Sequence, residues 1–355
     1  MADRFGHILC ITSFGESHGP SVGVVIEGLP PAFPIDLEHI HRELQRRRPG
    51  QSKLTTQRNE GDDFKIVSGV FEGYSTGAPI CILIPNNNQN SSDYDHLKNV
   101  YRPGHADRVY DQKYGIRDHN GGGRSSARIT AGWVAAGSIA KQFIQHVAQI
   151  KIQSVVSKIH HLEVNDIYHL DWQKAEDNIV RCPDPEMAEM MIQYIDSIKN
   201  EGDSVGGIIS TKIENCPLGL GEPVFDKLNA EIGKAILSIN AVKGIEFGAG
   251  FAATDMKGSE HNDTPVGGSN NEGGITGGIS NGKTITFNTA FKPVSSISKS
   301  QKSIDKDGNE IELKIEGRHD PCVLPRAVPI VEAMTALVIA DHWLMNLKNQ
   351  IMTQI

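Results

Sequence analysis

Apolar positions in the first quarter of the chain recur with two different periods, which predict strands and a helix. A run of apolar residues over 21–29 predicts a buried strand, and a pair of prolines ends it. Apolar residues at helical spacing predict a helix that begins after Asp36, a suitable N-cap, and stops before Pro49. The apolar segments 65–71 and 78–84 are joined by a turn-like stretch and predict a β-hairpin.

The later part of the chain continues this alternation. Helices are predicted after a glycine triplet at 121–123, over 185–200, near 225–236 and from about Pro329, with a strand over 205–213. The turn signal Lys-Asp-Gly-Asn before an alternating apolar segment predicts a further hairpin near the end. Helices and strands are thus mixed along the whole chain.

No low-complexity linker separates these elements. We therefore expect one mixed domain over residues 1–355, with two closely packed halves as the alternative. The polar stretches near 85–100 and 254–278 are long loops, and we expect them to be mobile and to close on a ligand.

Composition narrows the class of protein. A net charge of -8 disfavours general attraction to nucleic acid, because phosphates need a broad basic face. Five scattered cysteines without a CxxC pair predict reduced thiols and no metal site. No run of about 18 apolar residues and no secretory signal are present, so we expect a cytoplasmic protein that does not span a membrane.

A turn at residues 15–19, Gly-Glu-Ser-His-Gly, sets a carboxylate, a hydroxyl and an imidazole side by side after an apolar run. Glycine lets a ligand approach the backbone closely, and histidine moves protons easily near neutral pH. Ser17 and His18 are therefore candidates for chemistry. A surface loop with a solvated histidine is the alternative that the turn alone leaves open.

Basic and hydroxyl side chains follow the glycine triplet. Arg124, Ser125, Ser126 and Arg128, together with free amides at a helix N-terminus, favour binding of a phosphate. Neither a Walker loop nor a Rossmann fingerprint is present. Solvated arginines on a glycine-rich turn are the alternative.

Three arginines, residues 46–48, end the first predicted helix. Consecutive helical residues are about 100° apart, so the three cannot all face one side. Arg47 and Arg48 are placed to reach an anionic ligand beside the core. Cations at a helix C-terminus also favour the helix dipole without any ligand.

Three further turns carry chemically useful side chains. His105 lies on a Pro-Gly turn between Arg102 and Asp107, where a structural histidine is the alternative. The segment 317–322 sets Arg, His and Asp beyond a predicted strand, although its Arg/Asp pair could be a structural ion pair. The basic, hydroxyl-rich turn 292–296 is suited to a phosphate tail.

Six ordered motifs span nearly the whole chain and together resemble the chorismate synthase family. They are GESHG (15–19), RPGHAD (102–107), GGGRSSAR (121–128), GDSVGG (202–207), GSEHND (258–263) and GRHDPC (317–322). The resemblance implies an α+β fold, a single-domain β-α-β sandwich. It also implies a lyase that converts 5-enolpyruvylshikimate 3-phosphate to chorismate and phosphate by anti 1,4-elimination, in the shikimate pathway of aromatic amino acid biosynthesis. Reduced FMN is the implied cofactor, and a homotetramer is the implied assembly.

The resemblance also assigns residues to roles. His18 would protonate the departing phosphate, and His105 would protonate the reduced flavin. Asp320 would accept a proton from the flavin, with Ser17 as a relay. The implied flavin-binding residues are Arg124, Ser125, Ser126, Asn240, Ala241, Gly277, Lys292, Pro293, Val294, Ser295, Ser296 and Arg318, the exact glycine of the run 273–278 being open. Arg47 and Lys53 match positions assigned to NADPH, a possible reductant, and many relatives have arginine in place of Lys53. Arg48 and Arg128 are the arginines expected to bind substrate.

Two other functions stay open at this point. One is a flavin reductase or another phosphate-handling enzyme that shares the anion sites. The other is an RNA-binding module, which needs a basic face with stacking aromatic residues and is disfavoured by 6% aromatic residues and the acidic net charge.

Overall fold

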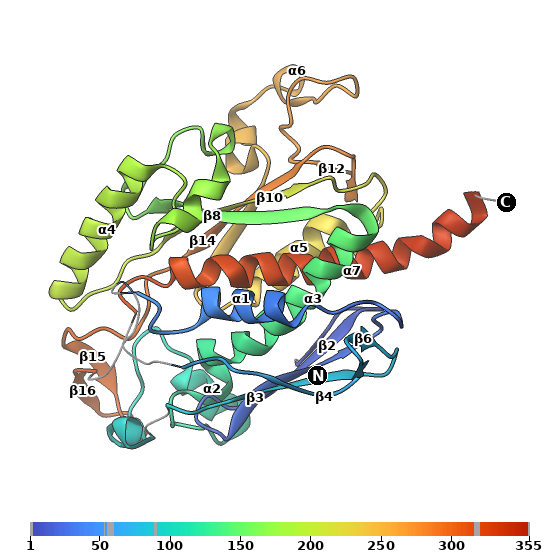
Figure 1. Cartoon of the computed structure of the whole chain (residues 1–355). Coiled ribbons are helices and arrows are strands. Elements are labelled where there is room, and N and C mark those ends of the chain that lie inside the picture. The colour runs from blue at the N-terminus through green and yellow to red at the C-terminus, as the bar shows by residue number, and fades with distance from the viewer. Residues whose placement is uncertain (1–2, 53, 55–59, 89–90, 316–319, 354–355) are drawn as a thin grey trace.

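Two five-stranded antiparallel sheets lie on opposite sides of a layer of helices (Figure 1). The computed structural model describes residues 3–52, 54, 60–88, 91–315 and 320–353. The first sheet has the order β1 (Arg4–Phe5), β2 (Cys10–Gly15), β3 (Ser21–Glu27), β7 (Ile80–Pro85), β4 (Lys65–Ser68). The second has the order β11 (Val242–Phe247), β14 (Ile285–Phe291), β10 (Gly207–Glu214), β8 (Lys151–Ile159), β9 (Leu162–Glu163).

The helices between the sheets are α1 (Leu37–Arg47), α3 (Thr130–Ala148), α5 (Leu228–Leu237) and α7 (Leu324–Thr353). Helix α3 packs against β3, α7 packs against β8 and β10, and α3 and α7 pack against each other. The β-α-β sandwich that the sequence predicted is therefore confirmed. One hydrophobic core runs through both sheets and the helices between them.

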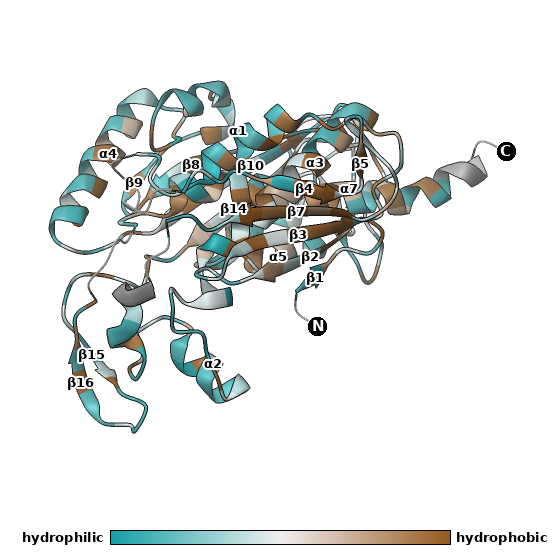
Figure 2. Cartoon of the chain, turned by 60° about the horizontal axis from the view of Figure 1, so that its bottom comes forward, coloured by the Kyte–Doolittle hydropathy of each residue, from teal (hydrophilic) through white to brown (hydrophobic). Residues whose placement is uncertain are grey.

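The inner face of the first sheet shows why the apolar pattern specifies this layer. Val22, Val24 and Ile26 of β3 stand opposite Ile84, Ile82 and Ile80 of β7, and all six are at most 2% exposed. Burial of a branched side chain of this size stabilises the fold by about 1.5–3 kcal/mol. Figure 2 shows β3 and β7 as apolar ribbons, whereas the outlying α2 (Asp107–Tyr114) is polar.

Close packing of α3 on α7 depends on small side chains. A Cβ added to Gly137 of α3 would lie 2.5 Å from Cα of Ala333 on α7, so only glycine allows this approach. Ala135, Ala136 and Ala140 of α3 are also buried. The helix pair forms the centre of the sandwich.

Helix α7 begins five residues before the predicted start and contains Pro329. A proline lacks the N–H that would bond to the carbonyl four residues earlier, here that of Pro325. The buried guanidinium of Arg181 donates a hydrogen bond to this carbonyl instead. The prediction of a start at Pro329 was wrong because this partner, distant in sequence, satisfies the freed carbonyl.

Helix α7 also has the length and apolar composition of a membrane-spanning helix. Among the described residues it alone is long and apolar enough to cross a membrane, yet 89% of the relevant window is buried inside the structure. The expectation that the chain has no apolar segment of about 18 residues is therefore wrong for α7. The apolar residues of α7 instead contact the two sheets and α3, as in a core helix.

Several predicted elements are confirmed with small changes. Asp36 caps α1 by accepting a hydrogen bond from the amide of His39 at 3.1 Å. Strands β4 and β7 pair as predicted, and a smaller hairpin of β5 (Val70–Phe71) and β6 (Tyr74–Ser75) occupies the connection between them. Helix α4 (Pro185–Asn200) and the hairpin β15 (Gln301–Ile304) and β16 (Glu310–Leu313) also match the prediction.

The two predicted loops contain local structure. The 3-10 helix η1 (Ser91–Leu97) contributes Leu97 to a small buried cluster with Leu313 and Ile315. In the second loop, which contains α6 (Gly258–His261), the Asp263 carboxylate accepts hydrogen bonds from the amides of Asn271 and Glu272, both at 2.9 Å. Mobility and closure of these loops stay predictions.

The remaining short elements are the 3-10 helices η2 (Gly123–Ser125), η3 (Ala127–Ile129), η4 (Ile167–His169), η5 (Trp172–Asp177) and η6 (Gly250–Asp255) and the strands β12 (Ile275–Thr276) and β13 (Ile279–Ser280).

Candidate active site

The glycine triplet at residues 121–123 lies where two of the predicted histidines meet. All three glycines have positive φ (+63°, +82° and +50°), a region that side chains rarely adopt. A Cβ added to Gly121 would overlap the ring of His18 and lie 3.0 Å from Ser17 Oγ. A Cβ added to Gly122 would lie 3.3 Å from His105 Cε1. The absence of side chains here lets both imidazoles approach one loop.

We call the turns 15–19, 102–107, 121–126, 240–241 and 292–296 the turn cluster, because direct contacts join them. The turn 15–19 follows β2 and is held by Asn86, whose amide donates to the carbonyls of Glu16 (3.0 Å) and Gly19 (2.8 Å). These contacts fix the turn against the end of β7.

Ser17 and His18 face the triplet from this turn. Ser17 is fully buried, and its hydroxyl donates to the carbonyl of Gly121 at 3.1 Å. The ring of His18 contacts Tyr94 edge to face, with ring centroids 5.0 Å apart. Burial raises the pKa of Glu16, and the nearby Arg124 opposes this effect.

His105 is held by Asp107 at the start of α2. Its Nδ1 lies 2.8 Å from one carboxylate oxygen of Asp107 and 3.1 Å from a guanidinium nitrogen of Arg102. Burial lowers the pKa of His105, and the hydrogen bond to Asp107 partly opposes this. Burial would raise the pKa of Asp107, but hydrogen bonds from Arg102 and His105 outweigh it and hold that pKa well below its usual range.

The turn 292–296 closes the cluster from the second sheet. The ammonium group of Lys292 donates to the carbonyl of Gly104 at 2.8 Å, and its amide donates to the carbonyl of Ala241 at 2.9 Å. Asn240 donates to the carbonyl of Ser125 at 2.9 Å. The carbonyl oxygen of the Asn240 side chain is buried and has no hydrogen-bond partner among the described residues. An acceptor left in this state indicates a site for a ligand donor.

The rest of that turn packs on the second sheet. Ser295 lies against Gly104, and Ser296 is buried. The carbonyl of Val294 accepts a hydrogen bond from Ser204 at 2.7 Å. The backbone of Pro293 lies so close to Gly206 that a Cβ there would be 3.0 Å from the Pro293 nitrogen. The GDSVGG motif therefore supports the turn 292–296.

Two predicted arginines share one buried carboxylate beside the cluster. Arg47 and Arg128 both form ion pairs with Asp62, and all three side chains are at most 3% exposed. Burial lowers the pKa of Arg47 to about 10, with Asp62 opposing. Arg128 also donates to the side-chain carbonyl of Asn86 at 2.7 Å, which connects this pair to the turn 15–19.

The other arginines lie in different surroundings. Arg48 is the half-buried C-cap of α1. Arg46 turns away from Arg47 and pairs with Glu43, Glu176 and Glu332, as the helical spacing requires. Arg124 pairs with Asp3 at 2.7 Å and donates to the carbonyl of Gly15 at 3.0 Å. Arg124 therefore holds the turn 15–19 in this structure.

Asp320 is linked to the cluster through Arg326. The two form an ion pair at 2.5 Å, and Arg326 donates to the carbonyl of Arg47 at 3.2 Å. Asp320 is thus linked, through Arg326 and the backbone carbonyl of Arg47, to the arginine that pairs with Asp62. Lys53 and Arg318 lie outside the described residues.

Two expectations differ from the geometry. The predicted free amides of a helix N-terminus after the triplet are wrong, because α3 begins only at Thr130. The amides of Ser125 and Ser126 instead donate within η2, to the carbonyls of Gly122 and Gly123. Gly277 lies apart from the cluster, on the exposed turn between β12 and β13.

Sequence reasoning missed Asp62, Asn86 and Arg326, which connect the predicted residues. None lies in a recognisable motif. Asp62 belongs to a polar loop and Asn86 to an asparagine-rich stretch. The one available signal was the surplus of arginines, which when buried require a carboxylate partner.

Three comparisons with known proteins agree with this geometry. The family model described as chorismate synthase matches residues 9–344. Chorismate synthase from Christiangramia forsetii is 55% identical, with 98% of this chain and 99% of that protein aligned. The protein of the same name from Flavobacterium psychrophilum is 54% identical, over 97% and 98% of the two chains. A crystal structure of chorismate synthase superposes with a TM-score of 0.76 at 32% identity, covering 97% of this chain and 94% of the other.

Proposed function

The chain belongs to the chorismate synthase family and converts 5-enolpyruvylshikimate 3-phosphate to chorismate, and we propose that the turn cluster is where this reaction takes place. It is a lyase of the shikimate pathway, which leads to the aromatic amino acids. The observation that carries the proposal is the approach of His18 and His105 to neighbouring glycines of one loop.

Charge around the cluster suits the substrate, which carries a phosphate and two carboxylates. Arg47 and Arg128 share the single carboxylate of Asp62, so this buried group keeps a net positive charge. Such a charge, held in a site with little water, attracts anions strongly. We propose that Arg48 and Arg128 contact the substrate. Arg48 is half-buried at the end of α1, whereas Arg128 is 3% exposed and must first open its pair with Asp62.

The turn 15–19 would manage the proton that the leaving group needs. We propose that the His18 imidazole donates a proton to the departing phosphate oxygen. In a separate step, Ser17 Oγ would relay a proton from the reduced flavin, and the Asp320 carboxylate would accept it. The contact of Ser17 with Gly121 holds the hydroxyl at the loop that His18 also touches.

His105 would move a proton through Nε2. Its Nδ1 faces the Asp107 carboxylate at 2.8 Å, which favours the tautomer with the proton on Nδ1. Burial lowers the pKa of His105, so the neutral ring predominates near neutral pH, and Nε2 takes up a proton before it donates one. Asp107 is in this proposal a positioning residue.

The cluster fits the FMN that family members use. The unpartnered buried carbonyl of Asn240 offers an acceptor, Ser125 a hydroxyl and Lys292 a cation. Reduced FMN supplies electron density for phosphate loss without net oxidation. The residues of the cluster proposed to hold it are Arg124, Ser125, Ser126, Asn240, Ala241, Lys292, Pro293, Val294, Ser295 and Ser296, together with Arg318. Gly277, which lies apart from the cluster within one chain, would have to reach the FMN from outside it.

Three finer points belong to the same proposal. NADPH would act as the reductant, through Arg47 and Lys53; because Arg47 is 1% exposed, contact with it requires the pair with Asp62 to open. The assembly would be a homotetramer, and the enzyme would act in the cytoplasm. The tetramer predicts a mass of four chains of 38.7 kDa in sedimentation.

An anaerobic assay tests the function and the reductant together. The purified chain is incubated with 5-enolpyruvylshikimate 3-phosphate and one of three additions: reduced FMN, oxidised FMN, or oxidised FMN with NADPH. We expect chorismate with reduced FMN and none with oxidised FMN alone. Product in the third arm would support NADPH as reductant, and its absence there would remove NADPH from the proposal. Oxidation of NADPH in the third arm, together with no chorismate in the first arm, would favour a flavin reductase.

A further inference from the structure

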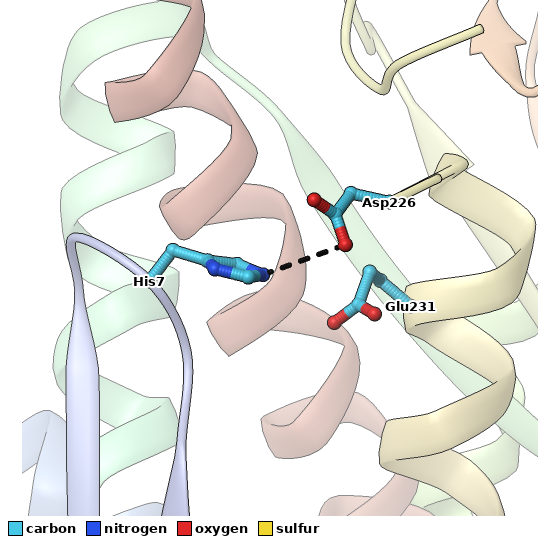
Figure 3. Close-up of side chains that lie close together, drawn as sticks. All are labelled: His7, Asp226 and Glu231. Carbon is cyan, nitrogen blue, oxygen red and sulfur yellow. Dashed lines mark ion pairs between the residues drawn. The ribbon is translucent and has the colours of Figure 1, made fainter. Parts of the chain in front are cut away.

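A histidine and two carboxylates from three separate elements point toward one another away from the turn cluster (Figure 3). His7 lies on the turn between β1 and β2, Asp226 precedes α5, and Glu231 lies on α5. One ligand atom of each lies within 4.8 Å of the others, and His7 Nε2 is 3.9 Å from an oxygen of Asp226. Figure 3 shows α7 passing directly behind them.

The spacing is close to what a small divalent cation requires. Ligands of a tetrahedral zinc ion, with bonds of about 2.0 Å, lie about 3.3 Å apart. The His7–Asp226 separation of 3.9 Å exceeds this by about 0.6 Å, and the other separations, all within 4.8 Å, exceed it by at most about 1.5 Å. The side chains of His7 and Asp226 are 41% and 42% exposed, so rotation of these two can close the gap. One imidazole nitrogen with two carboxylate oxygens is a ligand set that zinc accepts.

A second observation points to an occupant. His342 of α7 is 2% exposed, and its Nε2 has no hydrogen-bond partner among the described residues. The charged and titratable groups that influence its pKa are Asp341, Glu231, His7 and Asp226, and α7 packs against α5, the helix that carries Glu231. A buried polar atom is normally satisfied, so one left open on the helix that packs against α5 is in keeping with a bound cation or its water nearby.

We propose that His7, Asp226 and Glu231 bind a divalent transition-metal cation, Zn²⁺ in preference, with the buried His342 on the adjoining helix α7. The competing cation is Lys234, which lies 3.2 Å from Glu231 and is 56% exposed. Lys234 can move into solvent at little cost when the metal binds.

The metal would act as a clamp on the N-terminal turn. The Asp341 carboxylate of α7 already accepts hydrogen bonds from the amides of His7, Ile8 and Leu9, at 2.7, 2.7 and 2.9 Å. A cation on the His7 side chain would fix the same turn to α5. It would thereby join the first sheet to the helix layer without taking part in chorismate formation.

Metal titration of the full-length chain, after treatment with a chelator, tests the proposal. Calorimetry with Zn²⁺ should give one site, and Co²⁺ should give visible absorption without the near-ultraviolet band of thiolate ligands. The thermal midpoint should rise with Zn²⁺. In the variants His7→Ala and Glu231→Gln the affinity should fall by more than about tenfold, since even loss of an outer partner costs that much.

The matched control is His160→Ala. His160 and His161 are exposed and contact each other and the half-buried Tyr194, which makes them an alternative place for adventitious binding through imidazoles. We expect this variant to bind the metal as the unchanged chain does. Equal thermal midpoints of metal-free His7→Ala and the unchanged chain verify that the variant folds. The proposal is overturned if the chain binds no metal, if His7→Ala binds as tightly as the unchanged chain, or if a thiolate band accompanies cobalt binding.

Discussion

Replacement of Asp62 by asparagine should destabilise the fold strongly. Asp62 is fully buried and pairs with two guanidinium groups, those of Arg47 and Arg128, which are 1% and 3% exposed. Removing one partner of a buried ion pair costs about 3–5 kcal/mol, because a charge is left without compensation. Asparagine keeps the volume and one carbonyl acceptor, so we expect the lower end, about 3 kcal/mol of unfolding free energy.

Urea unfolding followed by circular dichroism measures this loss. The neighbouring Asp63 is exposed, and Asp63→Asn is the matched control, expected within about 0.5 kcal/mol of the unchanged chain. Burial would raise the pKa of Asp62, but Arg47 and Arg128 outweigh it and lower that pKa. The stabilisation is therefore present above about pH 4 and is lost as the pH falls through the folded pKa. Equal stability of Asp62→Asn and Asp63→Asn at pH 7 would refute the account of this buried group.

Three further changes test other parts of the structure. Gly122→Ala places a Cβ 3.1 Å from Ser125 Oγ and 3.3 Å from His105, so kcat/KM should fall by more than about tenfold. Gly115→Ala, also at positive φ (+72°) but with nothing within 4 Å, controls for backbone strain, and an equal loss there would contradict the argument. Asp107→Asn removes the hydrogen bond that raises the pKa of His105, so the alkaline limb of the kcat/KM profile should move to lower pH; an unmoved limb counts against His105 as a proton donor. Arg181→Met leaves the carbonyl of Pro325 unpaired and should lower the unfolding free energy by about 1–3 kcal/mol. Adding Pro329→Ala should recover part of that loss, because the new amide can bond to Pro325; no recovery would exclude this explanation.

The spacing of apolar residues along the chain was enough to predict the strands and helices that bury one face in the core. Alternating branched residues in the sequence predict the buried faces of β3 and β7, and Asp36 is predicted as a helix cap. The start of α7 could not be read in this way, because Arg181, far away in sequence, replaces the hydrogen bond that Pro329 removes.

The site likewise contains residues that the sequence could predict and residues that it could not. Ser17, His18 and His105 lie on short turns with strong local signals, and the glycine triplet joins them. Asp62 and Asn86 carry no such signal, since only the fold brings them to Arg47, Arg128 and the turn 15–19. The family resemblance supplied the roles of Asn240 and Lys292, and the structure adds the contacts between their turns.

The kcat of His18→Ala tests the central claim most directly. Chorismate formation is followed anaerobically with saturating reduced FMN and substrate, with His169→Ala as the control because His169 is exposed on η4. The account predicts a loss of about 10²–10⁴-fold in kcat for His18→Ala, the usual contribution of a positioned proton donor, and no loss for His169→Ala. An unchanged kcat in His18→Ala would contradict the assignment of the turn cluster as the place where the proton is delivered.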